Sequence, residues 1–425
     1  MSLVNIISAV GNNSSVYPLI VRDCGIENPA KIALTYQQNA RESKEMARHA
    51  TRERFIDEYG TSAVWLGGIP LVELIYDKIT KKSGYNPAVN LKLFKEEEKQ
   101  GLEYNIKKFA DKAPEAVQDL IKVKNNQKAF ERIMSGKFVA ATAIPITLMG
   151  VVLPKLNFKL TAKKFKEMEA NKNNNKKIDY SLLNLSAAEN FAKPKENISF
   201  KGIASVLANT NQVQKMAVTD GGLTVGRVGT ARNKNEKIEM GFKMSAMLLI
   251  NFVTPKYIQR GLDSFSKKLL GINVNVDPIV LNDKKFLKDI KDDTLLLPKQ
   301  GESVIDFIDN NPDAKFTKYA QKFSGVKFLK GTKIRDPRAY VDEKKVRGLA
   351  DSIVDFASSA KASGNIEKYA KKALCVKSAN IIANLGISSL LLAVGIPKAQ
   401  FLLRKIISGT DIDPGLIKQP EEKQA

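Results

Sequence analysis

The glycine-rich run from Asp220 to Arg232 has the residue types of an anion-binding loop. It reads DGGLTVGRVGTAR, so Gly226 and Gly229 stand beside Arg227 and Arg232. Exposed backbone N–H groups and two guanidinium groups would together bind a phosphate or a carboxylate. The run matches neither the GxGxxG pattern nor the P-loop, because a third glycine in register and a following Gly-Lys-Ser/Thr are missing. We predict a flexible connection between helices, with an anion-binding loop as the functional alternative.

Glu73 is the second candidate, since it is the one acid in the otherwise apolar stretch from Thr61 to Tyr76. An ionisable side chain inside a bilayer is costly and marks a functional site by default. On the outer face of a soluble or interfacial helix it would need no explanation, and Asp77 and Lys78 follow directly. The sequence leaves both interpretations open.

No enzymatic constellation accompanies these candidates. The chain has one histidine, His49, and its two cysteines, Cys24 and Cys375, lie 351 positions apart. This composition excludes most zinc sites, Cys–His nucleophiles and disulfide frameworks. We therefore expect no catalytic, cofactor or metal site, and two reduced thiols in a reducing compartment.

The charge of the 425-residue chain favours an anionic partner. Lys and Arg number 68 against 45 Asp and Glu, which gives a formal net charge of +23. Only 13 of the basic residues are arginine, the side chain that suits bidentate contacts with bases and phosphates. An excess of lysine fits attraction to anionic lipid headgroups, although the codon bias of an AT-rich genome would also produce it. Anionic membrane lipid is the expected partner, and nucleic acid is the alternative.

Four apolar segments indicate what surrounds the chain. Phe138–Pro154 is 17 residues long and Ser378–Pro397 is 20, and neither contains a charge. A transmembrane helix needs about 20 mostly apolar residues and at least about 17, so both are predicted to insert into a membrane. Thr61–Tyr76 and Met244–Pro255 suit two shorter apolar helices that pack beside them or lie at the membrane surface. The alternative is a soluble helical bundle with very apolar inner helices.

Each of the four apolar segments contains a proline, inside the first segment and at the end of the other three. Pro70, Pro154, Pro255 and Pro397 are each followed by a charged amphipathic stretch. Proline is unfavourable inside a helix but is accepted in its first turn, so each is predicted to end one helix at the membrane edge and to start the next. The lysine-rich stretches after the last three prolines would then contact anionic headgroups.

The expected fold is mainly α, because little of the chain alternates polar and apolar residues. Pro29 to Tyr59 is predicted to form one charged helix that ends at Gly60. Six regions differ in composition. Residues 1–60 form an amphipathic helical region, and residues 61–170 contain two apolar helices around a helical insert, with a basic helix after the second. Residues 171–200 are an Asn/Lys-rich linker, 201–271 the glycine-rich loop and third apolar helix, 272–375 an irregular and helical polar region, and 376–425 the fourth apolar helix with a basic tail.

These features predict a membrane-associated helical protein with a structural, scaffolding or transport-like role rather than a catalytic one. No Lys or Arg precedes Arg22, so a cleaved signal peptide is not expected, and an inner or plasma membrane is the predicted location. Both ends of both long apolar segments are basic, which gives no clear orientation across a membrane. The alternative is a soluble, cytoplasmic, basic protein that binds nucleic acid.

Overall fold

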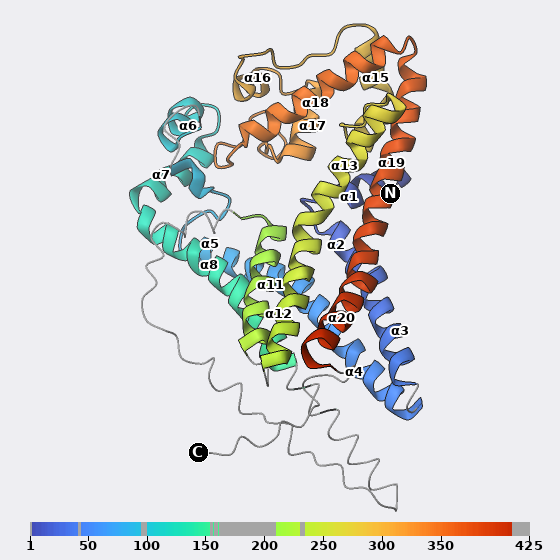
Figure 1. The fold of residues 1–425 in the computed structure, drawn as a ribbon. Helices are drawn as coiled ribbons and strands as arrows, with labels where there is room; N and C mark the ends of the chain where they lie inside the picture. Colours follow the sequence, from blue (N-terminus) through green and yellow to red (C-terminus); the bar gives the residue numbers. More distant parts are fainter. Residues whose placement is uncertain are drawn as a thin grey trace, which may run out of the picture.

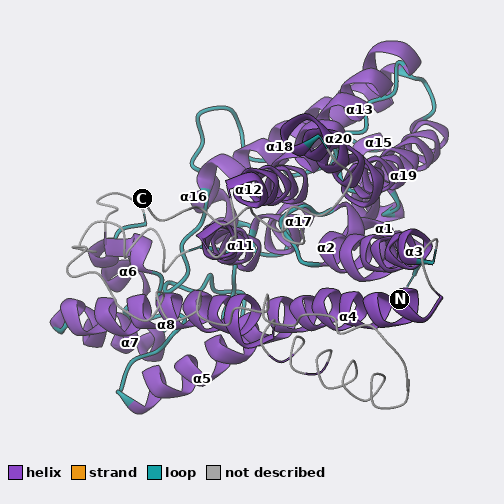
Figure 2. Ribbon diagram, turned by 60° about the horizontal axis from the view of Figure 1, so that its bottom comes forward, coloured by secondary structure: helices purple, strands orange, loops and turns teal. Residues whose placement is uncertain are grey.

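The computed structural model describes residues 2–40, 44–94, 100–153, 156, 160, 210–229 and 234–409. These residues form helices joined by loops, with no β-strand and one isolated bridge between Phe328 and Arg335 (Figure 2). The predicted mainly α fold is confirmed. Pro154, Arg232 and the predicted linker at 171–200 lie outside the described residues.

Long helices that pack side by side form the larger part of the molecule, which we call the bundle (Figure 1). Its helices are α1 (Leu3–Gly11), α2 (Tyr17–Arg22), α3 (Asn28–Asn39), α4 (Lys44–Ala63), α5 (Ile69–Lys82), α8 (Gln127–Thr147), α11 (Gln212–Gly229), α12 (Lys234–Leu248), α13 (Thr254–Leu270), α19 (Ile366–Leu390) and α20 (Ile396–Ser408). Helix α5 packs on α8, α8 on α11, α11 on α12, and α12 on α20. Segments far apart in the sequence therefore share one interior.

Two smaller helical parts adjoin the bundle (Figure 1). The helical cap, residues 272–365, lies at one end and contains α14 (Pro278–Leu281), α15 (Lys284–Lys291), α16 (Val304–Asn310), α17 (Lys315–Ser324) and α18 (Glu343–Ala362). The side helices, residues 83–126, contain the 3-10 turn η3 (Leu91–Phe94), α6 (Leu102–Phe109) and α7 (Pro114–Asn125).

The helical cap has an apolar core of its own. Phe286 lies between Tyr319 and Phe356, with ring centroids 5.6 and 6.4 Å away. Burial of such aromatic side chains is a main source of stability in water-soluble domains. Ala370 and Ala373, in the first turns of α19, belong to the same core. Helix α19 thus starts in the cap and continues into the bundle.

The region from Pro29 to Tyr59 forms two helices instead of the predicted one. Helix α3 ends at Asn39, α4 begins at Lys44, and the two pack along each other (Figure 2). Most helical stability in proteins comes from tertiary packing, which a helix hairpin provides and a single projecting helix would lack. The predicted end at Gly60 is also wrong, because α4 continues to Ala63.

Turns of π-helix precede five prolines of the bundle. In the described part of the chain these turns are η1 (Asp23–Glu27), η2 (Val64–Gly68), η4 (Leu148–Val152), η7 (Leu249–Val253) and η8 (Leu391–Gly395). A proline stands two positions after each turn, at 29, 70, 154, 255 and 397. The proline pattern of the sequence therefore marks a repeated local structure.

The π-turns let the helices continue through the prolines. In η7 the N–H of Thr254 donates to the carbonyl of Leu249, five residues earlier, and η8 has the equivalent bond. Proline offers no N–H and its ring crowds the carbonyl four residues before it, so a wider turn relieves the conflict. Pro70, Pro255 and Pro397 each lie in the first turn of a helix, α5, α13 and α20, and the π-turn before each joins that helix to the preceding one without a loop.

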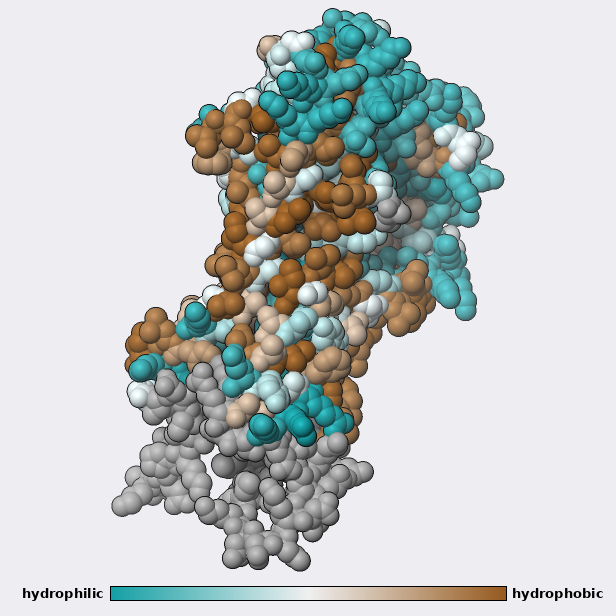
Figure 3. Space-filling model, turned by 90° about the vertical axis from the view of Figure 1, so that its right-hand side faces the viewer, coloured by the Kyte–Doolittle hydropathy of each residue, from teal (hydrophilic) through white to brown (hydrophobic). Residues whose placement is uncertain are grey.

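Large apolar side chains are exposed mainly on the bundle. Figure 3 shows hydrophobic residues over the middle of one face and hydrophilic residues over the cap. Among the described residues, only Leu296 and Val354 are exposed large apolar side chains of the cap, and the side helices have none. The outer faces of α5, α19 and α20 carry many of the others: Leu71, Leu74, Ile75, Ile382, Leu390, Leu402 and Ile406.

Two helical segments are long and apolar enough to cross a membrane. They are Gln127–Gly150 and Ile366–Ser408, judged by length and composition. The first overlaps the predicted insertion segment Phe138–Pro154 and the second contains Ser378–Pro397. The two apolar helices of the prediction are therefore present as helices.

Candidate functional site

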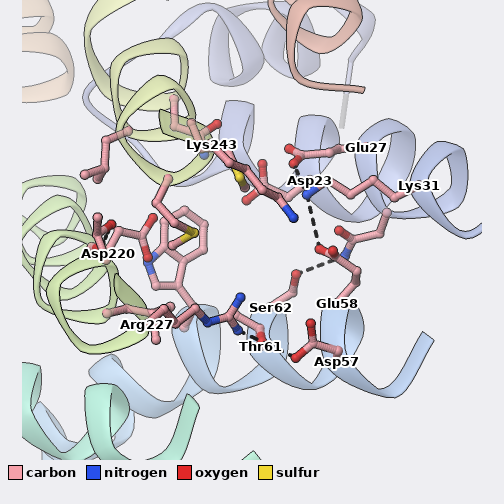
Figure 4. Close-up of a pocket in the computed structure, with 18 residues that line it drawn as sticks. Asp23, Glu27, Lys31, Asp57, Glu58, Thr61, Ser62, Asp220, Arg227 and Lys243 are labelled. Carbon is pink, nitrogen blue, oxygen red and sulfur yellow. Dashed lines mark hydrogen bonds and ion pairs between the residues drawn. The ribbon is translucent and has the colours of Figure 1, made fainter. Parts of the chain in front are cut away.

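A cavity lies among the helices of the bundle, where three of the π-turns meet (Figure 4). It encloses about 720 Å³, counting the part that opens to solvent. Helices α3, α4, α11 and α12 and the turns η1, η2 and η7 supply its wall: Asp23, Glu27, Asn28, Lys31, Asp57, Glu58, Thr61, Ser62, Trp65, Asp220, Leu223, Thr224, Arg227, Lys243, Met244, Met247, Leu248 and Asn251. Charged side chains are thus concentrated inside the bundle.

The π-turns place polar groups on the cavity wall. Asp23 and Glu27 are the first and last residues of η1, and Asn251 belongs to η7. Trp65 of η2 is 3% exposed and provides an apolar part of the wall. A π-turn inserts an extra residue into a helical turn, which changes the direction of the side chains and is frequent at functional sites.

Side chains satisfy two backbone carbonyls of the π-turns. Pro255 has no N–H for the carbonyl of Asn251, four residues before it, and Nη2 of the buried Arg22 donates to that oxygen at 3.1 Å. The Tyr59 hydroxyl donates to the carbonyl of Cys24 in η1 at 3.2 Å. An unpaired buried carbonyl is costly, so these two hydrogen bonds stabilise the widened turns.

Lys31 is the centre of a buried group of charges. Its Nζ lies 2.5 Å from Oε1 of Glu27 and 3.3 Å from Oε2 of Glu58. Oε1 of Glu58 lies 2.6 Å from Nη2 of Arg54. The side chains of Lys31 and Glu27 are 6% and 3% exposed, so solvent ions screen their attraction little. These ion pairs join α3 and η1 to α4.

The glycine-rich run forms a helix rather than the predicted loop. Helix α11 extends over Gln212–Gly229 and includes Gly226 and Arg227. The N–H groups of its interior are committed to the helix, so they cannot form the predicted anion cradle. Of the four residues proposed to bind the anion, Gly226, Arg227 and Gly229 are described, and of these Arg227 lines the cavity, where its Nη2 lies 3.6 Å from Oδ1 of Asp57 in α4.

Close helix packing explains one of the glycines in α11. A Cβ added at Gly222 would lie 2.5 Å from Cδ1 of Ile146 in α8, whereas one added at Gly221 would meet nothing within 4 Å. Small residues let neighbouring helices approach closely, and this packing outweighs the weak helix propensity of glycine.

Two charged residues of the cavity wall lie near opposite charges, Asp220 near Arg227 and Lys243 near Glu58, without a direct ion pair. Asp220 of α11 and Lys243 of α12 both line the cavity, and neither forms an ion pair with a described residue. Figure 4 places them on the α11–α12 side, across from Lys31 and its two glutamates. Each can therefore pair with a group that enters the cavity.

Three buried oxygen atoms of the cavity wall also lack a hydrogen-bond partner among the described residues. They are Oδ1 of Asp23, Oγ1 of Thr61 and Oδ1 of Asn251. Nε of Arg22 lies 3.8 Å from the Asp23 oxygen, which is too long for a hydrogen bond. Buried polar atoms are nearly always satisfied in native proteins, so water or a solute in the cavity would supply the partners of these atoms.

Glu73 lies outside the cavity wall and is paired with a lysine. Nζ of the buried Lys215 donates to Oε1 of Glu73, which joins α11 to α5. A similar pair joins α20 to α12, where Nε of Arg404 donates to Oε2 of Glu239 at 3.0 Å. Glu73 is thus half-buried and paired with a neighbouring helix of the bundle.

A polar seam joins α13 to α19. Nζ of Lys377 lies 2.6 Å from Asp263, and Nδ2 of Asn380 donates to Asp263 at 3.0 Å and to the Ser266 hydroxyl at 2.9 Å. Hydrogen bonds between polar side chains hold helices together where the surroundings provide no hydrophobic driving force.

One feature of the sequence could have indicated the cavity. Pro29 repeats the spacing of the other π-turn prolines, but its turn carries Asp23 and Glu27 in place of apolar residues. Lys31 and Glu58 lie in segments whose charges are typical of solvated helix faces. Only the packing of these segments brings the charges together.

No protein-family model, curated protein or solved structure matches the chain. Within the described residues, no group of three or more His, Cys, Asp and Glu side chains could hold a metal ion. The arrangement of carboxylates, cations and unsatisfied oxygen atoms can bind a polar or charged solute.

Proposed function

We propose that the protein is an integral membrane protein whose bundle spans an inner or plasma membrane, with a transport-like role. In this proposal the cavity offers a polar solute a binding place inside the bundle. The helical cap then lies in the aqueous phase on one side of the membrane.

The observation that carries the proposal is that the bundle buries charged side chains and exposes large apolar ones. Charged side chains such as Arg22, Glu27, Lys31 and Glu239 are buried there, while large apolar side chains are exposed on its surface. A soluble protein rarely exposes a contiguous apolar area of this extent. In hydrocarbon such a surface costs nothing, and ionisable residues face the interior of a bundle or a water-filled cavity.

The two long apolar segments give the proposal further support. Of the most apolar window, 33% is buried in Gln127–Gly150 and 44% in Ile366–Ser408. A core helix of a soluble protein would be mostly buried, whereas these leave most of their apolar surface outside. Helices also satisfy their own backbone hydrogen bonds, as spanning segments must.

Lysines near the cap would contact anionic headgroups. Lys268 at the end of α13 and Lys371 and Lys372 near the start of α19 are exposed where these helices meet the cap. A lysine at the surface of an anionic membrane contributes on the order of 1 kcal/mol to its attachment. This contact would adjust how the bundle sits, while its apolar surface holds it in the bilayer.

Fractionation of cells that express the full chain tests the proposal. We expect the protein in the membrane pellet, and we expect it to stay there after washes with high salt and then with alkaline carbonate. Release by salt alone would contradict insertion and indicate electrostatic attachment to the membrane surface.

Recovery in the first supernatant without detergent would reject the membrane proposal altogether. Binding to RNA and DNA would then be measured over a range of salt concentrations. A steep loss of affinity with rising salt would support the nucleic-acid alternative, because counterion release dominates that type of binding.

A further inference from the structure

The charges of the cavity divide into satisfied and unsatisfied groups. Lys31 is neutralised by Glu27 and Glu58, and Arg227 lies beside Asp57. On the α3–α4 side of the cavity, these residues therefore neutralise one another's charges. On the opposite side, one carboxyl group and one amino group form no direct ion pair with a described residue, although Arg227 and Glu58 lie nearby.

That remaining pair is Asp220 on α11 and Lys243 on α12, two helices that pack against each other. A ligand with only a positive charge would match the carboxylate but would add to the field of Lys243. A ligand with only a negative charge would have the reverse fault. A molecule that carries both charges matches both groups, and partnering charges in this way reduces the cost of burying them.

Other acceptor atoms of the wall add to the recognition. Thr61 Oγ1, Asn251 Oδ1 and Asp23 Oδ1 are buried without partners and can accept hydrogen bonds from an ammonium group. Trp65 and Met244 give the same cavity an apolar side.

We propose that the cavity binds a small zwitterion of the α-amino-acid class, with its ammonium group toward Asp220 and its carboxylate toward Lys243. The unpartnered wall atoms Asp23 Oδ1, Thr61 Oγ1 and Asn251 Oδ1 offer further hydrogen-bond acceptors to the ligand, and the apolar side contacts the amino-acid side chain. This inference names the solute of the proposed transport role and rests on that role.

Binding of matched probes to the detergent-purified full chain tests the zwitterion requirement. Isothermal titration would compare L-alanine with L-alaninamide, which lacks the carboxylate, and with propionate, which lacks the ammonium group. We expect L-alanine to bind and each of the other two to bind at least about tenfold more weakly, because a charge-assisted contact is lost. Equal binding of either single-charge probe would overturn the proposal, and so would failure of every amino acid in a panel of the twenty.

Two variants locate the site without depending on each other. We expect Asp220→Asn and Lys243→Met each to weaken L-alanine about tenfold or more. Asp220→Asn should spare propionate, and Lys243→Met should spare L-alaninamide. The control is Asp355→Asn, on the cap, whose carboxylate pairs with Lys267 at 41% exposure and should leave binding unchanged. Unchanged L-alanine affinity in both cavity variants would overturn the assignment.

The outcomes separate this inference from the membrane proposal. A protein that stays in the carbonate-washed pellet but binds no amino acid keeps the membrane role and loses the zwitterion site. A protein that binds L-alanine but is recovered in the first supernatant keeps the site and loses the membrane role.

Discussion

At the scale of single residues, Lys31 shows what the buried charges of the bundle require. An ammonium group at 6% exposure is costly by itself, and Glu27 and Glu58 offset this cost from two sides. Removing one partner of a buried pair leaves uncompensated charge behind, which is worse than never burying the pair. The stability of the bundle therefore depends on complete sets of partners.

We expect Lys31→Met to lower the free energy of unfolding by about 3–5 kcal/mol, since it leaves two buried carboxylates without their cation. The measurement is denaturation in detergent micelles followed by circular dichroism. Lys124→Met is the matched control, because Lys124 pairs with Glu103 at 46% and 72% exposure and such a surface pair contributes about 0–1 kcal/mol. Equal losses in the two variants would contradict the role of Lys31.

In the cap, Asp283 should make stability depend on acidity. Burial opposes its ionisation, but hydrogen bonds from Lys315, at 2.5 Å, and from the Tyr319 hydroxyl, at 2.8 Å, outweigh burial, so the pKa of Asp283 is lowered. A carboxylate with a lowered folded-state pKa stabilises the fold above its unfolded-state pKa of about 3.9. That contribution is lost as the pH falls through the folded-state value.

Asp283→Asn is therefore expected to cost about 1 kcal/mol near neutral pH, because Asp283 is partly exposed and still caps α15 as asparagine. The difference from the unchanged protein should shrink as the pH falls below about 4. Urea denaturation at a series of pH values measures it, with Asp351→Asn on the exposed face of α18 as the control. A difference that does not depend on pH would show that the charge of Asp283 is unimportant.

At the scale of elements, the sequence predicts helices better than their interruptions. Uncharged runs such as Ser378–Pro397 specify apolar helices locally, and these are present. Pro255 signals a break, but the π-turn that carries the helix through it depends on Arg22, which satisfies Asn251 from another helix. That partner is more than two hundred residues away in the chain, so local patterns do not reveal it.

The glycine-rich run shows the same dependence on distant contacts. Neighbouring glycines in a sequence favour a loop, yet Gly222 serves the approach of α11 to Ile146 of α8. For the cavity, the sequence identifies the run that contains Asp220 and Arg227, whereas the charged groups of α3, α4 and α12 in the wall resemble solvated residues until the helices pack. Local propensity is a weak guide wherever tertiary packing supplies the stability.

Two adjacent substitutions in α11 test this packing. Gly221→Ala should stabilise the protein by about 1 kcal/mol, because alanine is the better helix former and its Cβ meets nothing within 4 Å. Gly222→Ala should gain less or lose stability, because its Cβ would lie 2.5 Å from Ile146 Cδ1 and that side chain must move. Detergent-phase thermal denaturation compares them, and equal stabilisation would contradict the close approach.

At the scale of the whole molecule, the surfaces of cap and bundle differ. The cap buries aromatic side chains such as Phe286 and Phe356 and exposes few large apolar side chains, as a domain in water does. The bundle has an apolar core and buried ion pairs, and it also exposes many leucine and isoleucine side chains. Helix α19 connects the two, since its first turns belong to the cap core and its later turns carry the exposed Ile382 and Leu390. In the membrane proposal, the surroundings of the chain change from water to hydrocarbon along this helix.

The cysteines can report this change of surroundings. Cys375 is exposed on α19 shortly after the cap core, and Cys24 is half-buried in η1 of the bundle. We expect a membrane-impermeant maleimide to label Cys375 in only one of the two vesicle orientations, right-side-out or inverted, because the cap lies on one side. Cys375→Ser should remove that rapid labelling and leave a slow reaction of Cys24 that speeds up in detergent. Labelling of Cys375 in both orientations of intact vesicles would contradict a bundle that crosses the membrane with its cap on one side.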